Sequence, residues 1–142
     1  MKLVHVYVNF PGTTDEAFRL YQEVFRTKTL ARMTFGEVPW VPNVPESAKA
    51  KIMHAQLPIT NEVHLMASDF VEGVSPGQFV RGNDFNISVV AEDKAEADRA
   101  FALLSAGGAV RMPLANAPWG PYFGMCTDRF GVQWMVSLPN PA

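Results

Sequence analysis

The chain has 142 residues, of which 48% are hydrophobic and 18% are charged, and its formal net charge at pH 7 is -2. This length and composition are typical of one folded globular domain and exclude a disordered chain. The 12 basic residues do not cluster, and no apolar run approaches the roughly 20 residues that a bilayer span requires. We therefore expect neither nucleic acid, which needs a basic surface, nor a membrane as a partner.

The cysteine content and the first residues of the chain bear on its location. Cys126 is a single cysteine and cannot form an internal disulfide, which agrees with a reducing compartment. The N-terminal residues lack the basic start, long apolar stretch and cleavage site of a signal peptide. We therefore expect a cytoplasmic location. Because no motif places a base beside Cys126, it resembles a buried hydrophobic residue more than a catalytic thiol.

The first half of the chain predicts one strand, one helix and three further strands. Residues 3–9 alternate, with the valines on one face, as in a half-buried strand. Thr13 and Glu16 have the capping-box spacing that begins a helix, and the apolar stripe of that helix, which ends near Phe25, is expected to pack on the valine face. The three further strands are expected at residues 29–35, 52–57 and 63–68.

A proline-rich segment, residues 36–50, separates the second of these strands from the third. Its three prolines surround Trp40 and make a paired strand improbable, because proline has no backbone N–H to donate. We therefore predict a semi-rigid loop. Two interpretations are open: a lid whose Trp40 covers a pocket, or a surface loop anchored by a buried indole.

The same order of elements recurs after a glycine-rich connection at about residues 70–83. Asp93 can cap a second helix, and Gly107 and Gly108 can end it. The strands of this half are expected at residues 85–91, 109–112, 122–127 and 132–138. Residues 1–142 therefore predict a single domain with two βαβββ modules, at about residues 1–69 and 84–138.

The two modules also end on similar residues. Leu65-Met66-Ala67-Ser68 closes the first, and Trp134-Met135-Val136-Ser137 closes the second. This duplication predicts an α+β fold in which helices cover one face of the sheets and the other faces form a concave cleft. We expect Met66 and Met135 at equivalent positions facing the cleft, and Trp134 in the core because its strand parity opposes that of Met135.

The segment from Gly107 to Val136 carries the most specific motifs. They are Gly107-Gly108, Met112-Pro113-Leu114, Trp119-Gly120, Phe123-Gly124-Met125 and the run DRFGVQWMV at 128–136. With these motifs, the chain closely resembles the PhnB-like branch of the glyoxalase/bleomycin-resistance superfamily. It departs from that branch at Arg26, where glycine is usual, and in the Trp40 loop.

This resemblance implies the vicinal-oxygen-chelate fold, in which two βαβββ modules form a concave mixed-sheet cleft, commonly in a dimer. In the superfamily each cleft can hold a metal that binds adjacent oxygens of a substrate. Some sequences of the branch carry a demethylubiquinone methyltransferase label. We do not expect methyl transfer here, because the sequence has no glycine-rich strand-to-helix loop to hold a nucleotide-like cofactor.

The resemblance also implies where metal ligands would lie. The corresponding positions in this chain are His5, Met66, Asn86 and Met135. Thioethers are weak ligands for the divalent ions that chelate oxygens, so no metal cofactor is favoured. An alternative remains open in which His5, His54 and His64 together bind a divalent ion such as zinc, iron, manganese or nickel.

Without a metal, we expect the cleft to bind a small organic molecule through a few polar groups among apolar walls. The candidate ligand-binding residues are His5, Tyr7, Asn9, Phe35, Trp40, His64, Met66, Asn86, Ser88, Trp119, Phe123, Gln133 and Met135. Packing is the stronger interpretation for Trp119. No nucleophile elbow or paired general acid and base defines a reaction.

Three functional hypotheses follow. The leading one is a cytoplasmic, homodimeric, PhnB-like protein that binds a small molecule. The second is a metal-dependent isomerase, lyase or dioxygenase of the same superfamily. The third is an interaction module with a vestigial cleft.

Overall fold

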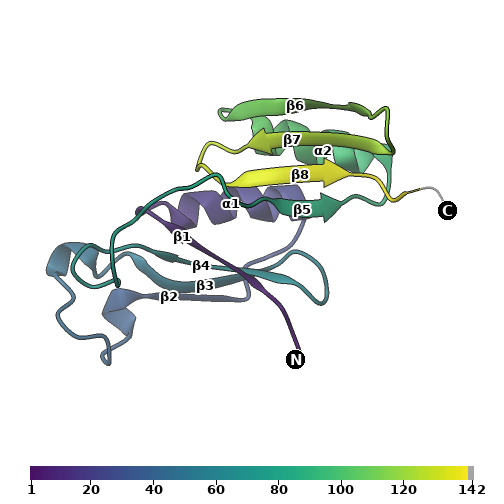
Figure 1. Ribbon diagram of the computed structural model, residues 1–142. Coiled ribbons are helices and arrows are strands. Elements are labelled where there is room, and N and C mark those ends of the chain that lie inside the picture. Colours follow the sequence, from purple (N-terminus) through teal and green to yellow (C-terminus); the bar gives the residue numbers. More distant parts are fainter. Residues whose placement is uncertain (141–142) are drawn as a thin grey trace. The chain divides into compact units, whose positions relative to one another are not determined.

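The computed structural model describes residues 1–140 and divides them into two compact units (Figure 1). The first unit is Met1–Val80 and the second begins at Arg81. This division falls inside the connection predicted at residues 70–83, and each unit contains one βαβββ module. Within residues 1–140, no helix is long and apolar enough to cross a membrane.

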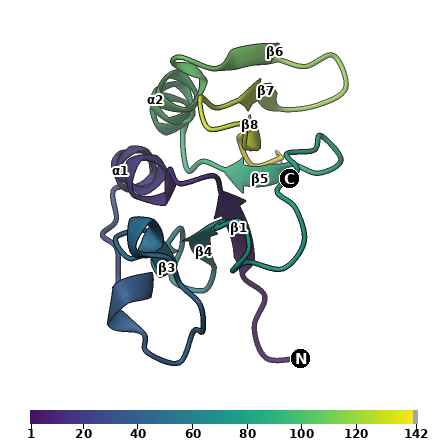
Figure 2. The ribbon, with the colours of Figure 1, turned by 90° about the vertical axis from the view of Figure 1, so that its left-hand side faces the viewer.

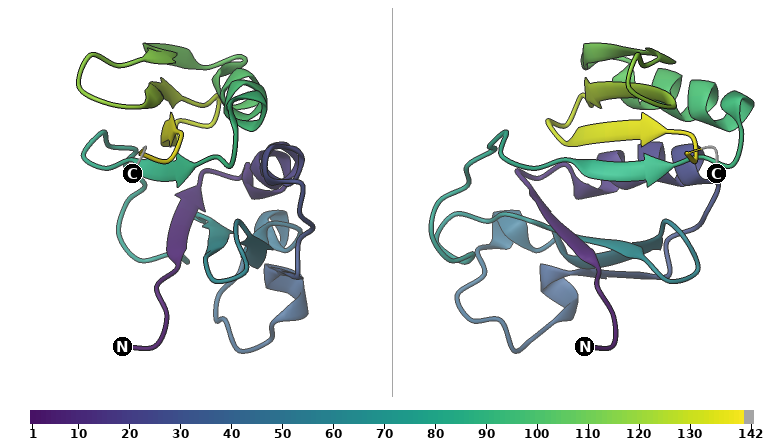
Figure 3. Two further views of the ribbon diagram at one scale, coloured as in Figure 1. Left: turned by 90° about the vertical axis from the view of Figure 1, so that its right-hand side faces the viewer. Right: turned by 45° about the vertical axis from the view of Figure 1, so that its right-hand side comes forward.

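The sheet of the first unit places the first and last strands of the module side by side. Its strand order is β1-β4-β3-β2, with β1 parallel to β4 and the other pairs antiparallel; Figure 3 shows β1, in purple, at one edge. The elements are β1 (Val6–Phe10), α1 (Thr14–Phe25), β2 (Ala31–Thr34), η1 (Phe35–Glu37), η2 (Glu46–Ala48), β3 (Ile52–Pro58) and β4 (His64–Asp69).

Burial in this unit follows the predicted alternation, with a shift along the first strand. Val8 and Phe10 are buried, whereas Val4 precedes β1 and is exposed. The apolar stripe of α1 is buried as expected, and the Phe10 and Tyr21 rings lie 6.4 Å apart. One face of the sheet is therefore buried, and the side chains of the other face are more exposed.

The N-terminus of α1 is held from the far end of the module. In the described part of the chain, Thr13 makes no side-chain cap hydrogen bond, so the predicted capping box is wrong. Instead, Asp69 Oδ1 accepts hydrogen bonds from the Thr14 backbone N–H (3.0 Å) and hydroxyl (2.7 Å), while Oδ2 accepts one from the Ile52 N–H (2.8 Å). A buried carboxylate thus joins α1, β3 and β4 and complements the helix dipole.

The second unit repeats this topology with the order β5-β8-β7-β6, in which β5 is parallel to β8. Figure 2 shows α2 nearly end-on, at one side of this sheet. The elements are β5 (Ile87–Val90), α2 (Lys94–Ser105), β6 (Ala109–Asn116), β7 (Tyr122–Thr127) and β8 (Gln133–Ser137). β6 continues past the predicted end at residue 112, and the shifts of register on both sides of Met112 accommodate this longer strand.

The predicted ends of α2 are confirmed. The Asp93 side chain accepts a hydrogen bond from the Glu96 N–H (2.8 Å), and Gly107 has a φ of 74°, which glycine adopts without strain. A Cβ atom on Gly124 would lie only 2.9 Å from the Phe101 ring. The absence of a side chain at Gly124 therefore lets α2 approach β7 closely.

The core of this unit contains a polar anchor. Trp134 is fully buried, as predicted, and its indole N–H donates to Asp128 Oδ2 at 2.8 Å. Asp128 Oδ1 also accepts from the backbone N–H groups of Phe130 and Val132. Cys126 is buried too, and burial raises the pKa of its thiol to about 11, which suits a packing residue rather than a nucleophile.

Candidate functional site

The open face of the first sheet gathers most of the polar residues predicted for the site. The open face of the first sheet is the face whose side chains alternate with the buried ones along β1, β3 and β4. The strand pairing sets Tyr7, Met66 and Gln56 in one row. A second row contains Asn9 and Ser68, whose hydroxyl donates to Asn9 Oδ1 at 3.1 Å. The face thus combines fixed polar groups with one adaptable thioether.

His5 and His64 lie together at one end of this face. Their rings stack with centroids 4.9 Å apart and planes inclined by 19°. His5 Nδ1 accepts a hydrogen bond from the His64 backbone N–H at 3.1 Å, and His64 Nδ1 lies 2.5 Å from the amide nitrogen of Gln56. Since a backbone N–H can only donate, His5 Nδ1 is an acceptor in this contact.

His54 lies apart from this pair. It contacts the Tyr7 hydroxyl through Nδ1 at 3.4 Å. The register pairs His64 with Pro58, so four residues of strand, about 13 Å, separate His54 from His64 along the sheet. The three histidines predicted as an alternative metal site do not converge. Among residues 1–140, no group of three histidine, cysteine or acidic side chains is placed to hold a metal.

The open face of the second sheet has a different chemistry. Met112, Met125 and Met135 stand opposite one another on β6, β7 and β8, and Ser88 on β5 completes this row. Each of the three methionine side chains is partly buried. Flexible, polarisable thioethers therefore form a continuous apolar strip across three strands. We call it the methionine row.

Polar groups flank one side of the methionine row. Asn86 Oδ1 accepts a hydrogen bond from the Arg111 guanidinium at 2.6 Å, and the same guanidinium donates to the Cys126 carbonyl at 3.0 Å. Gln133 Nε2 donates to the Phe85 carbonyl at 2.6 Å. On the other side, Phe123 is partly buried and pairs with Ser137.

The predicted equivalence of Met66 and Met135 is confirmed by the register. Met66 pairs with Tyr7 on the first strand of its module, and Met135 pairs with Ser88 on the first strand of the other. Both lie between buried neighbours on their own strands, so both point to the open face. Their contact with a ligand stays a prediction.

The remaining aromatic candidates lie elsewhere. Phe35 is buried in a cluster with Ala48 and Val71, not on the open face. Trp40 is 69% exposed, so the buried-anchor interpretation of its loop is wrong, and the lid interpretation stays a prediction. Trp119 lies between β6 and β7 and is 71% exposed, which contradicts the packing interpretation.

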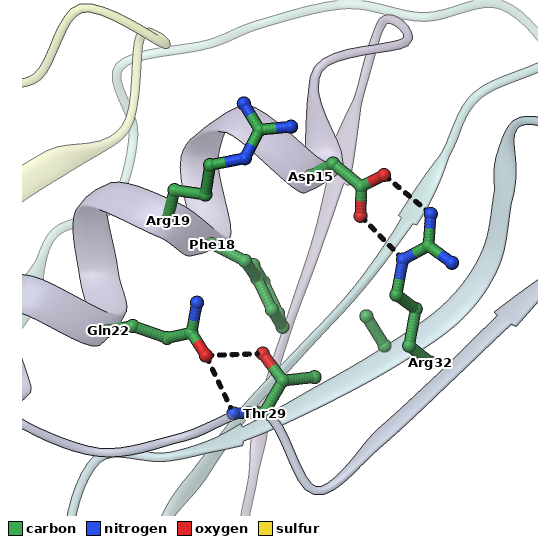
Figure 4. Close-up of a pocket in the computed structure, with 7 residues that line it drawn as sticks. Asp15, Phe18, Arg19, Gln22, Thr29 and Arg32 are labelled. Carbon is green, nitrogen blue, oxygen red and sulfur yellow. Dashed lines mark hydrogen bonds and ion pairs between the residues drawn. The ribbon is translucent and has the colours of Figure 1, made fainter.

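The sequence did not reveal a groove between α1 and the strands β2 and β3. Its volume is about 380 Å³, and it is lined by Asp15, Phe18, Arg19, Gln22, Thr29, Arg32 and Ala55 (Figure 4). Asp15 and Arg32 form a two-pronged ion pair, with nitrogen-to-oxygen distances of 2.7 and 2.9 Å. The hydrogen bonds from Arg32 lower the pKa of Asp15.

Comparison with known proteins identifies the family to which this arrangement belongs. The model of the glyoxalase/bleomycin resistance protein/dioxygenase superfamily matches residues 2–136. The chain belongs to this superfamily. Protein YjdN of Escherichia coli is 28% identical over 137 residues, which cover 93% of this chain and 92% of that protein.

Two solved structures of similar length share the fold of this chain. Protein PA1353 from Pseudomonas aeruginosa is 40% identical, with a TM-score of 0.81 and coverage of 96% of both chains. A PhnB protein from Bacillus cereus, 23% identical with a TM-score of 0.77, shares the fold over 96% of this chain and 98% of its own. The predicted α+β fold of two modules is thus confirmed.

The superfamily's metal positions can now be tested against the side chains present. Of the four corresponding residues, Met66 and Met135 offer only thioethers. His5 has its Nδ1 lone pair in a hydrogen bond to the backbone, and Asn86 Oδ1 accepts from a guanidinium. The oxygen-preferring divalent ions bind such a set poorly. The residues at these positions therefore do not fit the superfamily's metal.

Proposed function

We propose that this member of the superfamily binds a small aromatic or amphipathic organic molecule and does so without a resident metal. The observation that carries the proposal is the methionine row beside the bonded polar groups Asn86 and Gln133. Thioethers contact aromatic rings favourably and adapt to different shapes, while fixed polar groups set orientation.

The open face of the first sheet supports the same function. Tyr7 is 46% exposed and reaches His54, and Met66 lies between Tyr7 and Gln56 in the register. This face offers donors and acceptors around one thioether, whereas the second sheet offers thioethers bordered by polar groups. A ligand with an aromatic body and one or two polar substituents matches both kinds of surface.

The test is a binding screen with a matched pair of variants. A panel of aromatic metabolites and antibiotics is screened by thermal shift, and hits are measured by calorimetry. Met125→Gln places a polar amide in the centre of the methionine row and should weaken binding about fivefold or more. Val110→Gln alters an exposed apolar residue of β6 that pairs with Cys126 and so lies off the row.

Val110→Gln should leave the dissociation constant within about twofold of the wild type, which is a few tenths of a kcal/mol. Equal weakening by both variants, or no hit in the panel for a folded protein, would contradict the proposal.

The absence of a resident metal is tested separately. Protein prepared without a histidine tag or a chelator should contain well under one equivalent of zinc, iron, manganese or nickel by elemental analysis. A stoichiometric metal that is lost from the His5→Ala variant would favour the alternative, a metal-dependent isomerase, lyase or dioxygenase.

We also propose that the protein is a cytoplasmic homodimer, as the resemblance to the PhnB-like branch implies. Light scattering after gel filtration would show twice the chain mass of 15.7 kDa if the dimer forms. A mass of one chain at micromolar concentration would refute it.

A further inference from the structure

We propose that the groove between α1 and β2 is a second binding site, for a small aromatic carboxylate. Its residues belong to one unit and differ from those of the two open faces. Asp15, Arg19 and Gln22 recur at intervals of three and four residues, so they lie on one face of α1. Thr29 and Arg32 oppose them from β2 and the segment before it (Figure 4).

The acceptors in this groove are already engaged. Gln22 Oε1 accepts from the backbone N–H of Thr29 at 3.0 Å and from its hydroxyl at 3.2 Å. A backbone N–H can only donate, so the atom facing it is the amide oxygen, and the Gln22 amide nitrogen must point the other way. Both carboxylate oxygens of Asp15 are bonded to Arg32.

What remains available in the groove is a set of donors. The Gln22 amide has two N–H groups, and Arg32 uses Nε and one terminal nitrogen on Asp15, which leaves its other terminal nitrogen. Arg19 interacts with Asp15 through charge, and its guanidinium is directed away from the bonds drawn in Figure 4. The lining contains two guanidinium groups and one carboxylate, and Glu37 and Asp69 also act on Arg32 through charge.

A carboxylate suits these donors because it carries a negative charge and several acceptor sites in one plane. The Phe18 ring lies between the two bonded pairs in Figure 4, and Ala55 is also part of the lining. An aromatic body fits this position, and a volume of about 380 Å³ is enough for a single-ring acid. Acceptor-rich anions without an apolar part would use the donors but would leave the apolar part of the lining uncovered.

The experiment is an amide NMR titration of the full chain with benzoate as the probe. Benzoate should shift the amide signals of Arg19, Gln22, Thr29 and Arg32 in a saturable way. Benzyl alcohol and inorganic phosphate, which lack the charge and the ring respectively, should each bind about tenfold more weakly. Phosphate binding as tight as benzoate would overturn the assignment to an aromatic acid.

Two variants with the same change of charge complete the test. Arg19→Gln should weaken benzoate about tenfold, as expected for loss of one charge-assisted hydrogen bond. Lys28→Gln removes a positive charge from an exposed residue beside Thr29 that is not part of the lining, and should change the affinity by less than about twofold. Equal effects of the two variants, or shifts confined to other residues, would refute the site.

This test is independent of the proposed function. Met125→Gln should leave benzoate binding at the groove unchanged while weakening ligands of the methionine row. If one of the two sites binds no ligand, the experiments show this without changing the conclusion about the other site.

Discussion

Replacing Asp69 with asparagine should destabilise the first unit strongly, although the side chain keeps its size. Asp69 is 3% exposed and accepts three hydrogen bonds, two at Oδ1 from Thr14 and one at Oδ2 from Ile52. Asparagine has one acceptor oxygen, so its NH₂ group must face one of these donors. If the oxygen stays on Thr14, the buried N–H of Ile52 loses its acceptor.

The magnitude follows from these contacts. An unsatisfied buried donor costs about 1–3 kcal/mol, and loss of a negative charge at a helix start costs about 0.3–1 kcal/mol. The free energy of unfolding should therefore fall by about 1.3–4 kcal/mol, a large part of the roughly 5–15 kcal/mol that stabilises an ordinary domain. In urea, with a slope of about 2 kcal/mol per molar, the midpoint should fall by about 0.7–2 M.

Asp93→Asn is the matched control, because Asp93 caps the other helix and its side chain accepts one backbone N–H. Asparagine caps helices about as well as aspartate, so the control should lose less than about 0.5 kcal/mol. Urea unfolding followed by circular dichroism measures both variants. Equal midpoints for the two would show that the Asp69 hydrogen bonds do not carry the stability assigned to them.

Three further predictions concern other contacts. Folding raises the pKa of Cys126 from 9.0 to about 11, so the thiol contributes stability that is lost as the pH rises from 9 to 11. Urea unfolding measured over this pH range should show a smaller loss of stability for the Cys126→Ala variant than for the wild type. Trp134→Phe should lower the free energy of unfolding by about 2 kcal/mol in thermal unfolding, because Asp128 loses a buried donor and a cavity remains. A decrease below about 0.5 kcal/mol would contradict this packing. Arg32→Gln should raise the pKa of Asp15 toward 3.8 in a carboxyl NMR titration, since the lowering comes first from the Arg32 hydrogen bonds; an unchanged pKa would exclude that cause.

The order and limits of most elements could be predicted from the sequence because burial alternates with period two in the strands and recurs every three or four residues in the helices. The strand at Tyr122–Thr127 was predicted to the residue, and α2 to within one residue. β6 was predicted too short, since a proline at 113 argues against a ladder strand and bulges cannot be foreseen.

The contacts that depend on strand register could not be predicted from the sequence. His54 and His64 fall in two successive predicted strands, but their separation of four residues along the sheet is set by the pairing between β3 and β4. Met112 and Met125 were part of the quoted motifs, yet their alignment with Met135 needs the register of three strands. Local spacing also suggested the Thr13 cap, whereas the acceptor that the helix uses lies 55 residues away on Asp69.

The parallel pairing of β1 with β4 sets the order in which the chain can fold as it leaves the ribosome. β1 is an edge strand whose neighbour is β4. The first strand to be synthesised therefore cannot pair until the last strand of its module has been synthesised. The same holds for β5 and β8. Each module therefore closes only when its final strand emerges, and a nascent chain that stops after β3 carries both an unpaired first strand and a helix start without its carboxylate.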